Sequence, residues 1–305
     1  MNPGQFRLKA KMEVHGGPVY ALAAGHAPGL ILSGGSDKRV VSSIIAEQTQ
    51  GPLLFKLPSK VYSIAFDSDS GYYYFGNGHG QVHIVDYISA REIKCLQLHE
   101  GAMFSMLVYD RKIITGAEDG SIFLLDENGM GKKIETGTGS KVRMIRPADE
   151  QGIFLACLGN GELIMADTKG RILRRQKVHD GSCNAVLYLK NGYLITGGKD
   201  AYIRVLSAKT WKVEKEIPAH NWAVYDFALS KDGRFVSSAS RDKTVKIWSA
   251  ENLDFFQRLS RENGDGHQYS VNRLFWDHHS GLLVSAGDDR QLFIWENFEH
   301  SNRPD

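Results

Sequence analysis

Hydrophobic and polar residues alternate with a period close to two in short segments along the chain. Between residues 224 and 259 four such segments follow one another, around Phe227, Val236, Ile247 and Phe256. Glycine, aspartate and asparagine separate the segments, as in KDG at 231–233 and NG at 191–192, which is typical of hairpin turns. No segment keeps a helical apolar stripe over ten or more residues. The pattern therefore predicts short antiparallel strands, four to a unit, and an all-β fold.

This four-strand unit recurs at a nearly constant spacing. The segment SASRDKTVKIWS has counterparts whose anchor residues lie at positions 37, 79, 119, 160, 200, 242 and 289. The steps between successive anchors are 42, 40, 41, 40, 42 and 47 residues. A period of this length indicates a repeat architecture, so we expect seven units of about forty residues.

The unit resembles the WD repeat, whose members fold as β-propellers of four-stranded blades. Units six and seven carry the full set of four side chains: His220, Ser238, Asp242 and Trp248, then His267, Ser285, Asp289 and Trp295. Units one, three and five keep three of them: His15, Ser33 and Asp37; His99, Thr115 and Asp119; His179, Thr196 and Asp200. Units two and four are degenerate. The resemblance implies that each set forms a hydrogen-bonded chain that locks its blade.

We therefore expect one domain over residues 1–305, a seven-bladed β-propeller of four-stranded antiparallel blades. The seventh unit has only three strands, and residues 6–14 precede His15 as KVEKEIPA precedes His220. The N-terminal strand is thus expected to complete the last blade and to remove the free edges of the ring. The expected boundaries are 6–14 for that outer strand, about 15–57, 58–98, 99–137, 138–178, 179–219, 220–260 and 267–298 for blades 1 to 7, and 299–305 for a polar tail.

Composition and charge narrow the possible functions. The chain is 42% hydrophobic and 24% charged, with a formal net charge of +2, so nothing favours nucleic acid as a partner. No window holds the run of about 18 apolar residues that a membrane span needs, and the first residues lack the apolar core of a secretory signal. Cys95, Cys157 and Cys183 form no CxxC pair, so we expect reduced thiols and no zinc site. A cytoplasmic location is predicted.

Histidine, serine and aspartate together also occur in hydrolases. Five similar sets recur here at one spacing, whereas a catalytic triad is needed once, and no GxSxG motif is present. Glycines 76, 78 and 80 open no helix and precede no GK[ST], which argues against a phosphate-binding loop. His278 and His279 beside Asp277 are interpreted as turn residues. We therefore expect no enzyme activity, no cofactor and no metal.

The resemblance implies an interaction platform whose binding face carries the d–a and b–c loops around the central channel, with strands named a to d from the channel outward. The residue after the first core position of strand a is, unit by unit, Tyr20, Tyr62, Phe104, Arg143, Asn184, Tyr225 and Asn272. The aromatic ones either anchor a partner or plug the channel. Cations gather on units four to six at Lys141, Arg143, Lys199 and Arg241, with Glu118 and Asp288 as acidic exceptions.

We expect a partner-binding site at Tyr20, Tyr62, Phe104, Lys141, Arg143, Lys199, Trp222, Tyr225 and Arg241. A protein or peptide partner, acidic or phosphorylated, suits these cations, although a solvated charged rim is the simpler interpretation. The long step before Asp289 places an extended loop, SRENGDG at 260–266, on the same face. The function expected is a scaffold or adaptor, a monomeric propeller that can act within a complex. The alternatives are a structural subunit of a larger assembly and, less favoured, a propeller hydrolase.

Overall fold

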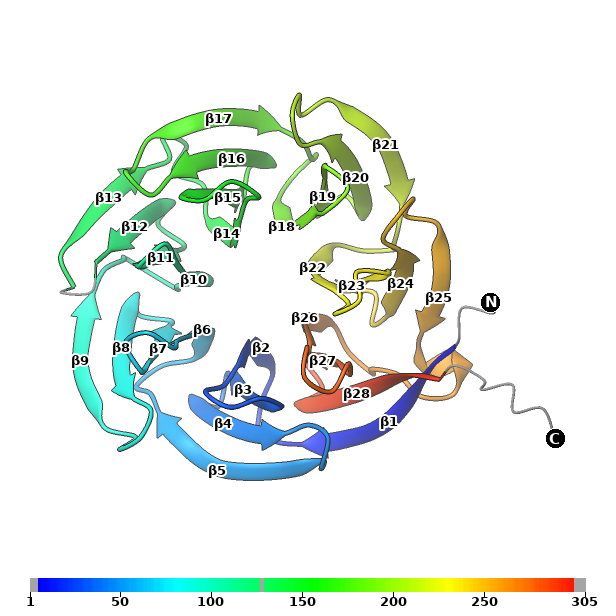
Figure 1. Ribbon diagram of the computed structural model, residues 1–305, viewed down its shortest axis with the longest axis horizontal. Coiled ribbons are helices and arrows are strands. Elements are labelled where there is room, and N and C mark those ends of the chain that lie inside the picture. Colours follow the sequence, from blue (N-terminus) through cyan, green and yellow to red (C-terminus); the bar gives the residue numbers. More distant parts are fainter. Residues whose placement is uncertain (1–4, 127–128, 299–305) are drawn as a thin grey trace.

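Seven four-stranded sheets form a closed ring in the computed structural model, which describes residues 5–126 and 129–298. The sheets stand around a central channel like the blades of a propeller, each with one edge strand at the channel and the other at the periphery (Figure 1). Every pair of neighbouring strands within a blade is antiparallel, as β2 with β3 and β3 with β4 illustrate. The predicted all-β, seven-bladed fold is confirmed.

The strands occupy equivalent positions in the seven blades. Strands a line the channel: β2 (Val19–Ala24), β6 (Val61–Asp67), β10 (Ser105–Tyr109), β14 (Val142–Pro147), β18 (Cys183–Leu189), β22 (Val224–Leu229) and β26 (Val271–Trp276). Strands b follow: β3 (Leu30–Gly35), β7 (Tyr72–Asn77), β11 (Lys112–Gly116), β15 (Ile153–Leu158), β19 (Tyr193–Gly198), β23 (Phe235–Ser240) and β27 (Leu283–Gly287). Strands c are β4 (Arg39–Ile44), β8 (Gln81–Asp86), β12 (Ser121–Leu125), β16 (Glu162–Asp167), β20 (Tyr202–Ser207), β24 (Val245–Ser249) and β28 (Gln291–Phe298). The outermost strands d are β5 (Thr49–Lys56), β9 (Glu92–Gln97), β13 (Gly131–Glu135), β17 (Ile172–Lys177), β21 (Val213–Pro218), β25 (Phe255–Leu259) and β1 (Gln5–Glu13).

Small residues on strands b let neighbouring blades approach each other. A Cβ atom added at Gly34 would lie 2.5 Å from a methyl carbon of Val61, the first residue of strand a in the next blade. Equivalent valines of the next blade pack against Gly116 and Gly197. A Cβ atom added at these glycines would lie 2.4 Å from a methyl carbon of Val142 and 2.6 Å from one of Val224, respectively. Any larger side chain would push the blades apart, because interiors are close-packed. Part of the high glycine content therefore serves blade packing and not turns.

Blade 7 is completed by the N-terminal strand, as predicted. β1 pairs antiparallel with β28, from Gln5 opposite Phe298 to Glu13 opposite Gln291, one residue earlier than the expected 6–14. Phe6 is buried, and its ring makes edge contacts with Phe235, Phe256 and Trp276. The side chain of Gln257 in blade 6 accepts from the backbone N–H and donates to the carbonyl of Phe6, both at 2.8 Å. The expected polar tail, 299–305, lies outside the described residues.

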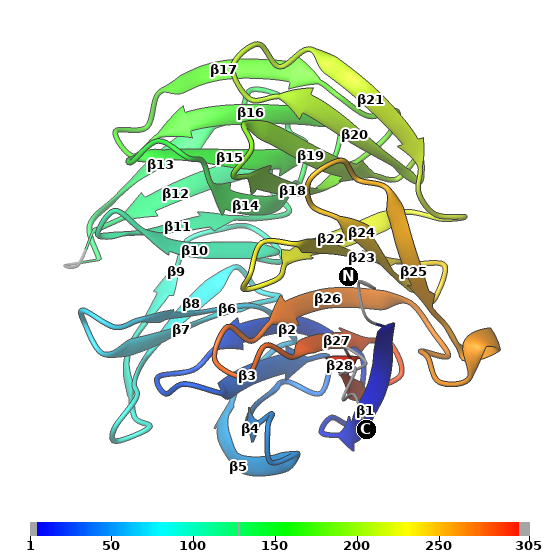
Figure 2. The same cartoon turned by 45° about the vertical axis from the view of Figure 1, so that its right-hand side comes forward.

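A single turn of 3₁₀ helix, η1 (Arg261–Asn263), lies in the extended loop between β25 and β26. Figure 2 shows this loop in orange, projecting from the edge of the ring beyond β25. Within the described residues, no helix has the length and apolar character needed to cross a membrane.

Replacing Phe6 by alanine tests the importance of the closure. We expect Phe6→Ala to lower the free energy of unfolding by about 3–5 kcal/mol, because a buried aromatic ring and its packing are lost. Arg7→Ala is the matched control on the exposed side of the same strand, and its ion pair with Glu296 should contribute less than about 1 kcal/mol. Urea unfolding followed by circular dichroism measures both. Deletion of residues 1–14 should lower the melting temperature sharply, and equal stability of the Phe6 and Arg7 variants would contradict the closure argument.

Candidate functional site

A hydrogen-bonded relay runs through blades 6 and 7. In blade 6 the indole N–H of Trp248 donates to Ser238 Oγ at 2.9 Å, and Ser238 Oγ lies 2.8 Å from His220 Nε2. His220 Nδ1 lies 2.9 Å from Asp242 Oδ2. Because the serine oxygen accepts from the indole, its own O–H is available to Nε2, and Nδ1–H donates to the carboxylate. A neutral imidazole therefore satisfies every group in the relay. Blade 7 repeats it with His267, Ser285, Asp289 and Trp295.

Blades 1, 3 and 5 contain the relay without its tryptophan. In each of these blades the histidine makes one hydrogen bond to the hydroxyl group and one to the aspartate, at 2.8 to 3.2 Å. The three sets are His15, Ser33 and Asp37; His99, Thr115 and Asp119; and His179, Thr196 and Asp200. All five relay hydroxyl residues, in blades 1, 3, 5, 6 and 7, have no exposed surface. A nucleophile must reach its substrate, so these hydroxyls are placed for structure and not for hydrolysis.

Two relay histidines, His99 and His220, and their aspartate partners all have lowered pKa values. Burial alone would raise the pKa of Asp242, but hydrogen bonds from His220, Thr244 and the backbone N–H of Asn221 hold it well below its usual range. Burial lowers the pKa of His99 and His220 and outweighs the attraction of their aspartate partners. Both shifts favour a neutral histidine beside an ionised aspartate, in agreement with the donor directions above.

These pKa shifts predict a protein that loses stability in acid. The unfolded chain binds protons near the ordinary histidine pKa of about 6.5, whereas folded His99 and His220 bind them only at lower pH. The stabilisation is therefore complete above about pH 6.5 and falls as the pH decreases; the aspartates add a further loss below about pH 4. Urea unfolding at several pH values between 7.5 and 4 measures the effect. Constant or rising stability on acidification would contradict neutral relays.

Removing one relay hydroxyl gives a second test. Ser238→Ala leaves His220 Nε2 and the indole N–H of Trp248 buried without partners, so we expect a loss of about 2–4 kcal/mol of unfolding free energy. Ser237→Ala is the control, because Ser237 is equally buried but makes a single bond, to the carbonyl of Ala228 at 3.2 Å, and its loss should cost about 1 kcal/mol. Similar losses in the two variants would show that the relay contributes nothing beyond an ordinary hydrogen bond.

Blade 2 replaces the relay with a different buried network, which the sequence repeat did not predict. Asn77 Oδ1 accepts from the backbone N–H groups of His79 and Gln81, and its amide donates to His83 Nε2 at 3.0 Å. His83 Nδ1 lies 3.2 Å from Glu92 Oε2. Asn77 thus holds the b–c turn, as the aspartate of the relay does in other blades. A polar residue at the end of strand b was the only sequence signal for it.

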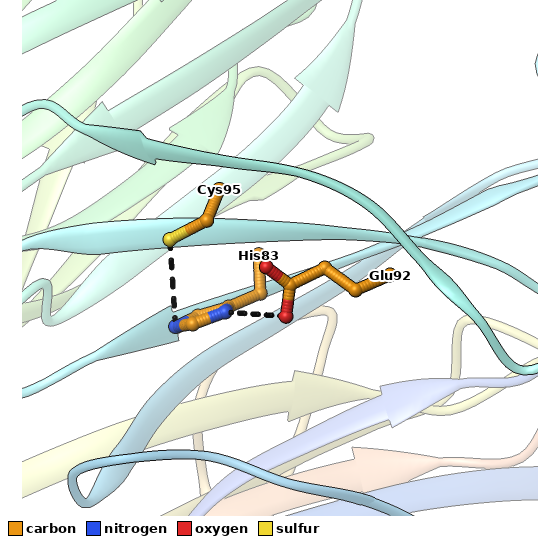
Figure 3. A group of neighbouring side chains, drawn as sticks. All are labelled: His83, Glu92 and Cys95. Atoms are coloured by element: carbon orange, nitrogen blue, oxygen red, sulfur yellow. Dashed lines mark hydrogen bonds and ion pairs between the residues drawn. The ribbon is translucent and has the colours of Figure 1, made fainter.

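The same network contains a group of side chains of the metal-binding type. His83, Glu92 and Cys95 each offer a ligand atom, and these atoms lie within 4.8 Å of one another (Figure 3). Cys95 Sγ faces Nε2 at 4.0 Å, but that nitrogen already accepts from Asn77. Burial also raises the pKa of the Cys95 thiol, which disfavours the thiolate that binds metals. We therefore interpret this trio as a hydrogen-bonded cluster.

The seven positions singled out on strands a meet at one mouth of the channel. Tyr20, Tyr62, Phe104, Arg143, Asn184, Tyr225 and Asn272, together with Arg273 and Asp288, line a cavity of about 330 Å³, which we call the channel cup. The rings of Tyr20 and Tyr62 stack at 5.0 Å, and Phe104 meets Tyr62 edge-on at 5.5 Å. The aromatic residues are half-buried and leave the cup open. Tyr20, Tyr62 and Phe104 pack against one another without filling the channel.

The predicted cations lie beside the cup, over blades 4 to 6. Lys141, Lys199 and Arg241 border a depression of about 540 Å³ that shares Arg143 and Tyr225 with the cup. Lys141 pairs with Glu118 at 2.5 Å, so its charge is partly offset. Arg241 lies 4.9 Å above the ring of Trp222, which is 56% exposed. The structure therefore brings all nine expected partner-binding residues to one face, called the top face below, and their role in binding stays a prediction.

Sequence periodicity did not single out three charged residues of the channel. Arg273 lies one position further along strand a than the residues compared unit by unit, where other blades have Ala21, Ser63, Ser105, Met144, Ala185 and Asp226. Arg146, deeper still, forms an ion pair across the channel with Asp226 at 3.2 Å. Extending the comparison along strand a would have found Arg273, Arg146 and Asp226, because these three charged residues interrupt a series of small or apolar ones.

Comparison with known proteins agrees with the fold and the relay. Residues 211–249 and 260–296 match the family model described as WD domain, G-beta repeat. The whole ring resembles the crystal structure of the WD40 β-propeller domain of Doa1, with a TM-score of 0.85 and 19% identity over 97% of this chain and 98% of the other. This chain is a seven-bladed β-propeller that contains WD repeats. The two matched segments carry the complete relays of blades 6 and 7.

Curated relatives of this WD-repeat propeller match over shorter segments. One is the probable cytosolic iron-sulfur protein assembly protein 1 of Kluyveromyces lactis, 24% identical over 41% of this chain. Another is the p21-activated protein kinase-interacting protein 1-like protein of Danio rerio, 30% identical over 30% of this chain. The matches span 40% and 27% of the lengths of these two relatives.

Proposed function

We propose that this WD-repeat propeller is a non-catalytic interaction scaffold that holds a protein or peptide partner on its top face. The channel cup carries the proposal, because aromatic side chains and guanidinium groups converge there in an open cavity. Rigid aromatic anchors and arginine are the side chains that contribute most at protein interfaces. The buried relay hydroxyls support a non-catalytic function, since a hydrolase needs an accessible nucleophile.

The names of the relatives point in the same direction. One is called an assembly protein and another a kinase-interacting protein. Those roles belong to the relatives, and this chain shares only part of their length. A cytoplasmic location also stays a prediction.

An acidic or phosphorylated partner is the finer part of the proposal. Arg143, Lys199 and Arg241 lie around the depression next to the cup. Arginine forms bidentate charge-assisted hydrogen bonds with carboxylate and phosphate groups. Tyr62 and Tyr225 would contact the apolar part of the same segment.

A second candidate, a structural subunit of a larger assembly, is favoured by the outer edge of the ring. Exposed apolar side chains gather in the outermost hairpins of four consecutive blades, at Ile44, Leu53, Ile88, Ile93, Met130 and Leu173. Apolar side chains grouped in this way can mark an interaction surface. They lie on the side of the propeller and away from the channel, so variants can separate the two candidates.

Affinity capture with mass spectrometry tests the proposal. The tagged full chain is compared with Tyr62→Ala/Tyr225→Ala, Arg143→Glu/Arg241→Glu and Ile88→Lys/Ile93→Lys in an extract of its own cells. We expect the captured partner to be lost, at least about tenfold, from the first two variants, because interface hot spots contribute 2 kcal/mol or more. The outer-edge variant should retain it. Loss from the outer-edge variant alone would favour the structural subunit and contradict the scaffold proposal, and equal melting temperatures exclude misfolding.

A further inference from the structure

The floor of the channel cup is a guanidinium group that reaches across the ring. Arg273 belongs to blade 7, yet one of its terminal nitrogens donates to the carbonyl of Phe104 in blade 3 at 3.3 Å. The other donates to the carbonyl of Asn272 at 3.3 Å. Both distances are at the long end of the range for N–H···O bonds. Both acceptors are neutral, and Asp226, whose negative charge favours the charged form of Arg273, is already paired with Arg146.

The carboxylates of the channel are already engaged. Asp226 Oδ2 accepts from the backbone N–H of Leu274 at 3.0 Å, and Oδ1 accepts from the backbone N–H of Phe227 at 2.9 Å and from Arg146 at 3.2 Å. Asp288 Oδ1 accepts from the amide of Asn272 at 2.8 Å. Across the described parts of the chain, neither Arg143 nor Arg273 has an ion pair within 4.0 Å. A guanidinium removed from water without a counter-charge is costly.

Further donors line the same cavity. The hydroxyl groups of Tyr20, Tyr62 and Tyr225 make no hydrogen bond to any described residue. Burial raises the pKa of all three tyrosines, so these hydroxyls keep their protons at neutral pH and can donate. Arg143 stands over the face of Phe104, 4.8 Å from the ring centre, which fixes its guanidinium at the wall of the cup. The cup is therefore rich in unused donors.

The charge of the cup selects the kind of ligand. Aromatic walls alone would suit a cation such as a lysine side chain, but two guanidinium groups repel one. Arg143 and Arg273 exceed Asp288 by one positive charge, which a single anionic group would neutralise. The cavity of about 330 Å³ has room for one such group with water, and not for a folded segment.

We propose that the channel cup is the receptor for one anionic group, a carboxylate or a phosphate, that the partner inserts between Arg143 and Arg273. The inference rests on the proposed function for the identity of the carrier, a segment lying on the top face. Arg273 thereby becomes a specificity-determining residue: it forms charge-assisted hydrogen bonds from the floor while Arg143 forms them from the wall. Acidic residues of the partner outside the cup would meet only the more exposed rim cations.

Small probes test the receptor without the partner. The probes are inorganic phosphate and three capped pentapeptides, acetyl-Gly-Gly-Xaa-Gly-Gly-amide, in which Xaa is glutamate, phosphoserine or glutamine. Titrations of the full chain at constant ionic strength are followed through the arginine Nε–H signals in NMR spectra. We expect saturable shifts at Arg143 and Arg273 with phosphate and with the glutamate and phosphoserine peptides, and none with the glutamine peptide.

Three variants locate the site. Arg273→Met and Arg143→Met each should weaken binding of the phosphoserine peptide at least about tenfold, as expected for a lost charge-assisted bond. Arg91→Gln is the matched control, because Arg91 is exposed and lies between β8 and β9, outside the residues that line the cup and the depression, and its effect should stay below about threefold. Melting temperatures show whether each variant is folded. If Arg273→Met does not fold, Arg143→Met still tests the site.

Four results would overturn the inference. They are the absence of saturable shifts, equal binding of the glutamine peptide, equal weakening by the Arg91 variant, and binding of phosphate but of neither anionic peptide, which would assign the cup to a free oxyanion. The proposed function fails separately. If the probes bind the cup but no partner is captured on the top face, the result contradicts the scaffold proposal and not the receptor. A partner lost from Tyr62→Ala/Tyr225→Ala but unaffected by Arg273→Met would contradict the receptor alone.

Discussion

Closure of the ring by β1 is the constraint on which the rest of the structure depends. Each hydrophobic cluster is shared by two adjacent blades, so no blade can bury its faces without both neighbours. Phe6 belongs to the cluster between blades 6 and 7, whereas Met12 and Val14 belong to the cluster between blades 7 and 1. One strand therefore seals two interfaces. The contact joins residues nearly 300 positions apart, which makes it costly in chain entropy and leaves its stability to side-chain packing.

The closed ring and the local relays together hold the loops of the top face in fixed positions. Each relay histidine lies in a d–a loop and each relay aspartate lies in a b–c turn, so the relay ties together the two kinds of loop that form the top face. A backbone N–H from the same d–a loop adds a second tie, as at Gly16 to Asp37 and Asn221 to Asp242. Loops held in this way lose little entropy when a partner binds. The residues that stabilise the blades thus also prepare the site.

Periodicity explains what could be predicted and what could not. The strand order and the number of blades follow from the repeat, and the closure completes it. Seven of the positions that line the cup could be predicted because they occur at the same place in every unit. Asn77 and His83 were not predicted, because no other unit has asparagine or histidine at these two positions of the repeat. The reach of Arg273 to Phe104 was not predictable either. It joins blades on opposite sides of the channel, and a repeat along the chain carries no information about contacts across the axis.

The near-neutral total charge conceals an arrangement in which the two signs are separated. Burial opposes ionisation, but hydrogen bonds hold the pKa of the relay aspartates of blades 1, 3, 5 and 6 below the usual range. These blades therefore each hold a negative charge beside the top face, offset in blade 5 by Arg204 at 2.6 Å from Asp200. The axis instead carries Arg143 and Arg273. An acidic segment is thus repelled by the relay carboxylates and attracted only at the centre and over blades 4 to 6. Complementarity of this kind fixes the register and orientation of a partner more than it raises affinity, and it follows from relay aspartates that stay ionised.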